Sequence, residues 1–309
     1  MTFALVFPGQ GSQSIGMMQP FAESPVVRDT FAEASDALGQ DLWQLVAEGP
    51  AEALNATVNT QPVMLTAAYA VYRLWLEKGG ARPAMVAGHS LGEYTALVVA
   101  GVVAFRDAVP LVRFRAQAMQ EAVPIGTGAM AAILGLEDQA VRDACAEASQ
   151  GEVVEAVNFN APSQVVIAGH KSAVERGVAA CKARGAKRAV LLPVSAPFHS
   201  SLLKPAADRL AGYLNDVTFQ AAAIPVVNNV DVNIVDEPAA IKEALARQAC
   251  NPVRWVEVIR RMKEGGVSHV GECGPGKVLA GLVKRIDGTL QGMAIADPQG
   301  LNAALGTLK

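Results

Sequence analysis

The 309-residue sequence contains only four cysteines, and none of them lies in a pattern that would bind a metal. They are Cys145, Cys181, Cys250 and Cys273, and no C-x-x-C pair or cysteine–histidine spacing connects them. Neither a metal site nor a disulfide framework is therefore expected. We interpret the four residues as core or near-surface thiols.

Long apolar runs and charge of one sign are also missing. The longest apolar stretch, residues 95–105, is too short to cross a bilayer, and residues 1–8 have no basic leader. The formal net charge is −3 without a run of like charges, which argues against nucleic acid or a membrane surface as a general partner. With 51% hydrophobic residues available for a core, we expect a globular, cytoplasmic protein.

One short motif is the best candidate for chemistry. The apolar run 85–88 is followed by Gly88-His89-Ser90-Leu91-Gly92 and then by a helical pattern. In a G-x-S-x-G turn between strand and helix, the serine hydroxyl lies over the helix N-terminus, where negative charge is favoured. Ser90 is therefore the candidate nucleophile, although an ordinary helix N-cap is the alternative.

A second glycine-rich turn follows the first predicted strand, residues 3–7. Pro8-Gly9-Gln10-Gly11-Ser12-Gln13 could direct backbone N–H groups into a cleft before a helix begins. It contains neither G-K-[ST] nor G-x-G-x-x-G, so a nucleotide site is disfavoured. A tight strand-to-helix connection without function is the alternative.

Two predicted helices lie near these turns. One begins at residue 60, with Pro62 near its first turn, and runs to about residue 78, and the other spans 105–121. The second carries Arg113 and Arg115, which point to different faces because they are two positions apart. One of them could point inward, whereas solvent exposure of both is the alternative.

Residues 126–195 read as an inserted subdomain. The pattern predicts the order β-α-β-β-α-β, which is the ferredoxin-like order, with a turn at residues 160–162. The fold class is therefore α/β, with a core formed by residues 1–125 and 196–309 and a cleft between the two parts. The predicted elements are strands 129–134, 153–158, 164–168 and 188–192, and helices 138–149 and 172–184.

The chain returns to the core through a loop rich in proline and serine. His199 lies in this loop, before a helix that ends near residue 215, and is a better candidate base than His89, His170 or His269. An exposed loop histidine is the alternative. The remaining predicted elements are strands 224–228, 268–272 and 293–296, helices 239–248, 252–263 and 277–285, and a short final helix.

Six segments together resemble the malonyl-CoA:acyl carrier protein transacylase family of bacterial type II fatty acid synthesis. The resemblance implies an α/β-hydrolase-like core that carries a ferredoxin-like insertion, with the active site in the groove between them. It spans nearly the whole chain in the family's order. The segments are residues 7–13, 88–94, 115–119, 158–162, 198–200 and 248–255.

The resemblance also implies roles for individual residues. Ser90 would form a malonyl-serine intermediate, with His199 as its base in a Ser-His dyad. Arg115 would bind the malonyl carboxylate, and the backbone carbonyl of Gln248 would orient the histidine. The oxyanion hole would be formed by the backbone N–H groups of Gln10 and Leu91.

His89, Asn160 and Phe198 would line the substrate pocket, and Phe198 would favour malonyl over methylmalonyl groups. The implied partners are malonyl-CoA and acyl carrier protein, and the reaction needs no cofactor of the enzyme's own. We expect a monomer. Two basic clusters could dock the acidic carrier, although solvated surface charge is the alternative: Lys182, Arg184, Lys187 and Arg188, and Lys277, Lys284 and Arg285.

Three other functions remain open from the sequence. An acyltransferase of malonate decarboxylase or polyketide systems would share the same motifs. A serine hydrolase would use water as acceptor, with an acidic partner for the histidine and no arginine for an acyl carboxylate. A catalytically silent binding subunit would keep the fold alone.

Overall fold

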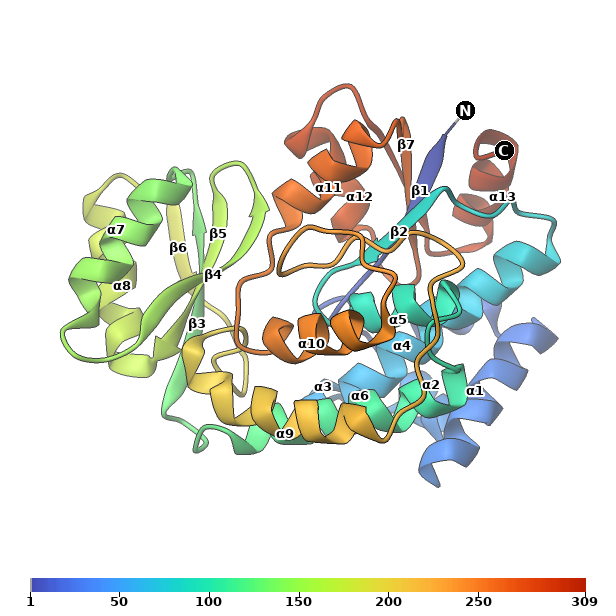
Figure 1. Ribbon diagram of the computed structural model, residues 1–309, viewed down its shortest axis with the longest axis horizontal. Helices are drawn as coiled ribbons and strands as arrows, with labels where there is room; N and C mark the ends of the chain where they lie inside the picture. Colours follow the sequence, from blue (N-terminus) through green and yellow to red (C-terminus); the bar gives the residue numbers. More distant parts are fainter. Residues whose placement is uncertain (1) are drawn as a thin grey trace.

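The computed structural model describes residues 2–309 as a mixed α/β structure with two separate sheets (Figure 1). The sheet of the larger body is parallel, in the order β2-β1-β7-β8. In this register Leu5 lies between Val86 and Gly271. Its strands are β1 (Phe3–Phe7), β2 (Met85–Gly88), β7 (His269–Cys273) and β8 (Gln291–Ile295).

Strand β1 shows why this sheet is buried on both faces. Every residue from Phe3 to Phe7 is buried. Phe3, Leu5 and Phe7 belong to one hydrophobic cluster, whereas Ala4 and Val6 belong to another. Alternate side chains of a strand point to opposite faces, so a continuous apolar run fits a parallel sheet that is covered by helices on both sides.

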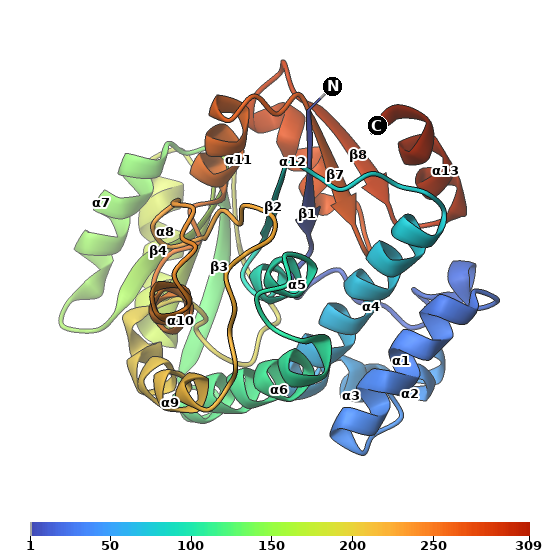
Figure 2. The same ribbon diagram turned by 45° about the vertical axis from the view of Figure 1, so that its right-hand side comes forward.

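Helices cover both faces of this sheet. Helix α5 lies directly below β1 and β2, and α4 and α6 pack beside it (Figure 2). Helices α11 and α12 supply apolar side chains to the cluster on the opposite face. The helices of this body are α1 (Pro25–Leu38), α2 (Leu42–Glu48), α3 (Ala51–Asn55), α4 (Thr57–Glu77), α5 (Gly92–Val99), α6 (Phe105–Glu121), α9 (Lys204–Asn215), α10 (Pro238–Gln248), α11 (Trp255–Glu264), α12 (Val278–Ile286) and α13 (Pro298–Thr307).

The second sheet is antiparallel, with the strand order β4-β5-β3-β6, and lies at the left of Figure 1. Two helices pack together on one face, and the other face carries a small apolar cluster that includes Met130 and Val166. The chain order is the predicted β-α-β-β-α-β. The elements are β3 (Gly128–Leu134), α7 (Asp138–Ser149), β4 (Val154–Ala161), β5 (Gln164–His170), α8 (Lys171–Ala183) and β6 (Arg188–Leu191).

Backbone hydrogen bonds join the two bodies, in addition to the two segments of chain that connect them. The backbone N–H of Val253 donates to the Val157 carbonyl at 2.8 Å, and the N–H of Phe159 donates to the Val253 carbonyl at 3.0 Å. All elements of the second sheet lie within residues 126–195. The division of the chain into domains at these two positions stays a prediction.

Three sequence predictions for the larger body are wrong. Residues 224–228 form no strand, because they pair with β2 only through the Val86–Val226 bridge before the chain turns away at Asn228. The turn at residues 8–13 leads to further turns and a short 3₁₀ helix, Gln19–Phe21, instead of an α-helix. Helix α4 begins at Thr57, so Pro62 is its sixth residue and lies beyond the first turn.

The end of β4 and the start of α11 differ from the prediction because of strand pairing. Strand β4 continues to Ala161, which still pairs with Gln164, so the turn consists of Pro162 and Ser163. Asn160 is therefore a strand residue. Helix α11 begins at Trp255, because Val253 is held in the bridge to β4.

Candidate active site

The turn between β2 and α5 places Ser90 in a strained conformation. Its φ angle is 51°, in the left-handed region that residues other than glycine rarely adopt. Both glycines of the motif are required by close approach. A Cβ atom on Gly88 would lie 1.8 Å from the Gly92 carbonyl carbon, and one on Gly92 would lie 2.0 Å from the Phe7 carbonyl oxygen. The local sequence therefore forces the serine out of the strand direction.

His199 faces this serine. The Ser90 Oγ lies 2.7 Å from the His199 Nε2, and the His199 Nδ1 lies 2.9 Å from the Gln248 carbonyl oxygen. A carbonyl can only accept, so Nδ1 carries the proton and Nε2 presents a lone pair to the hydroxyl. The imidazole is buried, with 3% exposure, which excludes the alternative of an exposed loop histidine.

The electrostatic environment keeps this histidine neutral. Burial, followed by the charge of Arg115, lowers the pKa of His199 to about 3. The imidazole is thus unprotonated at neutral pH and can accept a proton from the hydroxyl. His170 and His269 lie elsewhere, bonded to the Val153 N–H and the Ser268 hydroxyl respectively.

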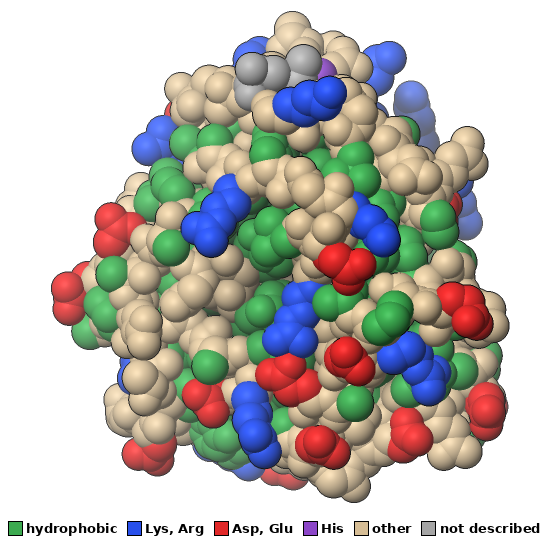
Figure 3. Space-filling view, turned by 90° about the vertical axis from the view of Figure 1, so that its right-hand side faces the viewer, with side chains coloured by type: hydrophobic (Ala, Val, Ile, Leu, Met, Phe, Trp, Pro, Cys, Tyr) green, Lys and Arg blue, Asp and Glu red, His purple; other side chains and the backbone are tan. Residues whose placement is uncertain are grey.

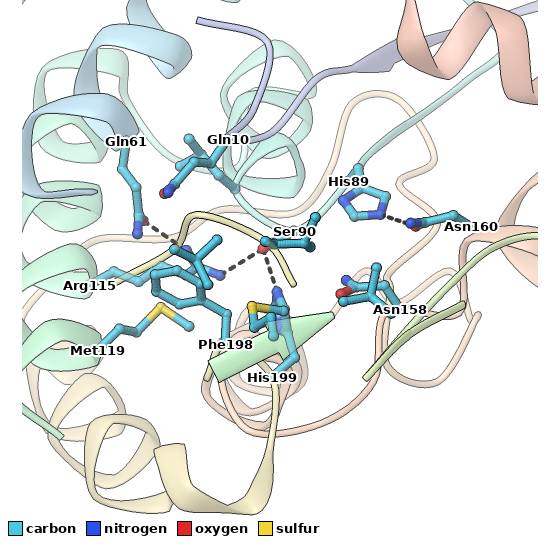
Figure 4. A pocket seen from close by; sticks show the side chains of 15 residues that line it. Gln10, Gln61, His89, Ser90, Arg115, Met119, Asn158, Asn160, Phe198 and His199 are labelled. Atoms are coloured by element: carbon cyan, nitrogen blue, oxygen red, sulfur yellow. Dashed lines mark hydrogen bonds between the residues drawn. The ribbon is translucent and has the colours of Figure 1, made fainter. Parts of the chain in front are cut away.

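Arg115 is the arginine of α6 that points inward. It is 2% exposed, and its guanidinium donates to Ser90 Oγ at 3.1 Å and to Gln248 Oε1 at 2.9 Å (Figure 4). A third bond runs to Gln61 Oε1 at 2.7 Å. Burial lowers the pKa of Arg115, but a guanidinium remains charged. Arg113 instead bonds to Gln40, away from the site.

A polar network lies behind the serine. The Gln248 side chain donates to the Ser90 carbonyl at 2.9 Å and to Glu93 Oε2 at 3.0 Å. Burial raises the pKa of Glu93 to about 7. Asn229 bonds to both Glu93 and Ser90. The network links the nucleophile to the residue that supports the histidine.

These groups open into a cavity of about 210 Å³. Figure 4 shows Arg115 and His199 both reaching Ser90, and His89 turned away to Asn160, whose Oδ1 lies 2.8 Å from His89 Nε2. All nine predicted site residues except Gln248 line the cavity. The full lining is Gln10, Gln61, His89, Ser90, Leu91, Arg115, Met119, Met130, Asn158, Asn160, Val166, Leu192, Val194, Phe198 and His199.

Two backbone donors on this lining have no acceptor. Within residues 2–309, neither the N–H of Gln10 nor that of Leu91 takes part in a hydrogen bond. The Gln10 side chain is fixed by the Thr57 hydroxyl, which donates to its Oε1 at 2.8 Å. Free N–H groups beside a nucleophile can bind an oxyanion.

A second cavity of about 150 Å³ shares Gln10, His89 and Asn160 with the first. It extends past Gln164 to the start of α12, where Val278 is exposed. The site is therefore a groove with two lobes between the two bodies.

Sequence reasoning missed Gln61, Glu93, Asn158 and Asn229 as site residues. Glu93 and Asn158 lie inside the segments 88–94 and 158–162, so their closeness in sequence to Ser90 and Asn160 is a signal that they belong to the site. Gln61 precedes Pro62, which in the sequence indicates only the start of a helix. Asn229 carries no local signal, because it approaches Ser90 from 139 residues away.

The cysteines lie outside the site. All four cysteines are free, and Cys145, Cys181 and Cys273 are buried. Among residues 2–309, no cluster of histidine, cysteine or acidic side chains could hold a metal ion. Over the same residues no helix is long and apolar enough to span a membrane.

Comparison with known proteins agrees with this chemistry. The chain belongs to the acyl transferase domain family, whose model matches residues 4–289. It is 60% identical to the malonyl CoA-acyl carrier protein transacylase of Escherichia coli K12 over 98% of each chain. These similarities place it, within that family, with the malonyl CoA-acyl carrier protein transacylases and confirm the resemblance of the motifs.

Two solved structures are similar to this chain over nearly its whole length. The acyl-carrier-protein S-malonyltransferase of Burkholderia pseudomallei is 66% identical, with a TM-score of 0.98 over 99% of this chain and 100% of that one. A malonyl-transacylase solved in complex with its type II PKS acyl-carrier protein is 55% identical, with a TM-score of 0.98 over 99% of each chain.

Proposed function

We propose that this protein transfers the malonyl group from malonyl-CoA to the phosphopantetheine thiol of acyl carrier protein by a ping-pong mechanism. The observation that carries the proposal is the contact of one hydroxyl, that of Ser90, with both a neutral His199 and the charged Arg115. The names of the relatives support the same reaction.

In the first half-reaction the Ser90 Oγ attacks the thioester carbonyl while His199 Nε2 takes the hydroxyl proton. The oxyanion is held by the free N–H groups of Gln10 and Leu91. Collapse of the tetrahedral intermediate breaks the C–S bond, and the imidazolium returns its proton to the coenzyme A thiolate. Malonyl-Ser90 remains.

In the second half-reaction the thiol of the carrier attacks the malonyl ester. His199 takes the thiol proton and then gives it to the Ser90 alkoxide, which leaves as the thioester forms. The Gln248 carbonyl orients the ring through Nδ1, so the catalytic pair is a Ser-His dyad without a carboxylate. This favours transfer over the serine hydrolase.

Arg115 selects the malonyl group. One methylene separates the free carboxylate of malonate from the thioester carbonyl, so its binding group must lie beside the nucleophile. The guanidinium lies 3.1 Å from Ser90 Oγ and can hold a carboxylate bidentately. Phe198, on the same cavity, restricts substituents at the α-carbon and disfavours methylmalonyl groups.

Because the carrier is acidic, its docking requires local positive charge on this chain. The face in Figure 3 carries both acidic and basic side chains. We propose the two predicted clusters as docking sites, since all seven side chains are exposed. In the second cluster Arg285 donates to Gln164 Oε1 at 2.5 Å, at the rim of the second cavity.

Several finer features belong to the same proposal. The larger body is an α/β-hydrolase-like core, and the second sheet with its helices is a ferredoxin-like insertion. The enzyme acts as a cytoplasmic monomer. It needs no resident cofactor, because the thiols that carry the malonyl group belong to coenzyme A and to the carrier protein. A type II polyketide carrier is the second candidate partner, favoured by the solved complex.

Steady-state kinetics with malonyl-CoA and holo acyl carrier protein test the mechanism. Varying one substrate at several fixed concentrations of the other should give parallel double-reciprocal lines, and Ser90→Ala should give no transfer. Intersecting lines would rule out the covalent intermediate. Release of malonate to water at the rate of transfer would instead support a hydrolase.

A further inference from the structure

We propose that Asn229 is a positioning residue that holds the strained turn of the nucleophile. Its side-chain Oδ1 accepts from the Ser90 N–H at 2.7 Å, and its Nδ2 donates to the Gly88 carbonyl at 2.8 Å. One amide therefore ties the last residue of β2 to the serine two positions later. The residue is completely buried and does not line the cavity, so it acts on Ser90 and not on substrate.

The turn needs such a partner because of its conformation. Ser90 has a positive φ, which is unfavourable unless surrounding contacts impose it. The bond to Asn229 fixes the peptide plane before Ser90 and occupies its N–H. The next donor, the Leu91 N–H, is left free at the cavity. An amide accepts at its oxygen and donates at its nitrogen, so the short Asn229 side chain can bond to the Ser90 N–H and to the Gly88 carbonyl at the same time.

Asn229 is itself anchored on the network that supports His199. Its backbone N–H donates to Glu93 Oε2 at 2.9 Å, and that same oxygen accepts from the Gln248 side chain at 3.0 Å. The Gln248 carbonyl in turn accepts from His199 Nδ1. The buried side chain of Glu93 thus helps to position both the nucleophile and the base. Loss of the Asn229 amide shifts Ser90 relative to His199.

The neighbouring Asn228 is a matched control. It is also buried, but its Oδ1 accepts from the N–H groups of Asp231 and Val232 and has no bond to the serine turn. Asn228→Ala disturbs the same loop, whereas Asn229→Ala removes both bonds to the turn. Thermal unfolding of each variant separates a loss of stability from a loss of positioning.

The test is the single-turnover rate of Ser90 acylation by malonyl-CoA, with affinity measured in a Ser90→Ala background. Asn229→Ala should slow acylation about 100-fold, because a misplacement of about 1 Å costs that much. Its malonyl-CoA affinity should stay within about threefold, since Arg115 is untouched. Asn228→Ala should acylate within about threefold of the wild type.

Asn229→Asp adds a readout that a purely structural role would not change. The ionised carboxylate keeps the acceptor for the Ser90 N–H but loses the donor to the Gly88 carbonyl, and protonation restores an O–H donor. Acylation by this variant should therefore exceed that of Asn229→Ala and rise as the pH falls. Glu93, whose Oε2 accepts from the Asn229 N–H and whose pKa is raised to about 7 by burial, also titrates in this range, so the pH profile is compared with that of the wild type.

The inference depends on Ser90 being the nucleophile, and the two can fail separately. A wild-type enzyme that is not acylated would refute the proposed function. If the wild type is acylated and Asn229→Ala reacts within about threefold of it, the positioning role is refuted. The same conclusion follows if Asn228→Ala slows the reaction as much as Asn229→Ala.

Discussion

The larger body and the antiparallel sheet contribute unlike walls to one cavity. The larger body supplies Ser90, Arg115 and His199, each hydrogen-bonded and backed by buried polar groups. The sheet supplies mainly apolar side chains such as Met130 and Val166. The comparison indicates that the larger body stabilises the developing charge, whereas the apolar face of the sheet, together with Phe198 packed against it, sets the shape of the acyl group.

Substitutions in the two walls should differ in how much they reduce activity. Removing one member of a buried polar network leaves its partners unsatisfied in a region of low dielectric. Removing apolar atoms from an open groove loses only contact area. Variants of the polar wall should therefore have the larger effects.

The largest effect is expected for His199→Ala. Without the base, the Ser90 hydroxyl keeps its proton, and acylation should fall by about 10⁴-fold. The burst of coenzyme A release measures this step. Malonyl-CoA affinity should be retained because Arg115 remains, and acylation within about tenfold of the wild type would remove His199 from the mechanism.

Arg115→Ala should change specificity more than chemistry. The malonyl carboxylate would be left without its charged partner, so the preference for malonyl-CoA over acetyl-CoA should fall by roughly 10²–10³, the value of a buried charge pair. Arg113→Ala, on the same helix but bonded to Gln40, is the control and should keep the preference. Equal loss with both acyl groups would contradict the role.

Phe198→Ala probes the shape of the site and should have a smaller effect. The space that the smaller side chain leaves at the α-carbon should raise methylmalonyl-CoA turnover relative to malonyl-CoA turnover by about tenfold, as expected for one methyl group. The ratio of kcat/KM values for the two substrates measures it. An unchanged ratio would mean that another side chain contacts the α-carbon.

The smallest effect is expected for the pH dependence of acylation. Because the pKa of His199 is lowered to about 3, the base is unprotonated above that value, and kcat/KM for acylation should stay flat from pH 8 down to pH 5. Glu93, with a pKa raised to about 7, also titrates in this range, so Glu93→Gln is measured alongside. An inflection near the ordinary histidine value of about 6.5 in both proteins would contradict the neutral imidazole.

Features set by local sequence and features set by distant contacts differ in how far the sequence predicts them. Strand β1, the Ser90 turn and helix α7 carry local patterns strong enough to place them. Residues 224–228 look like a strand, but their pairing is decided by the chain turning at Asn228. Asn229 and Gln61 acquire a role only through partners distant in sequence, so no local pattern reports them.

Intact-protein mass spectrometry after mixing the enzyme with malonyl-CoA is the decisive measurement. Malonyl-Ser90 should appear as one adduct, be absent from Ser90→Ala, and disappear when holo acyl carrier protein is added, with the malonyl group recovered on the carrier. An adduct that persists in Ser90→Ala, or one that is lost only to water, would contradict transfer through this serine.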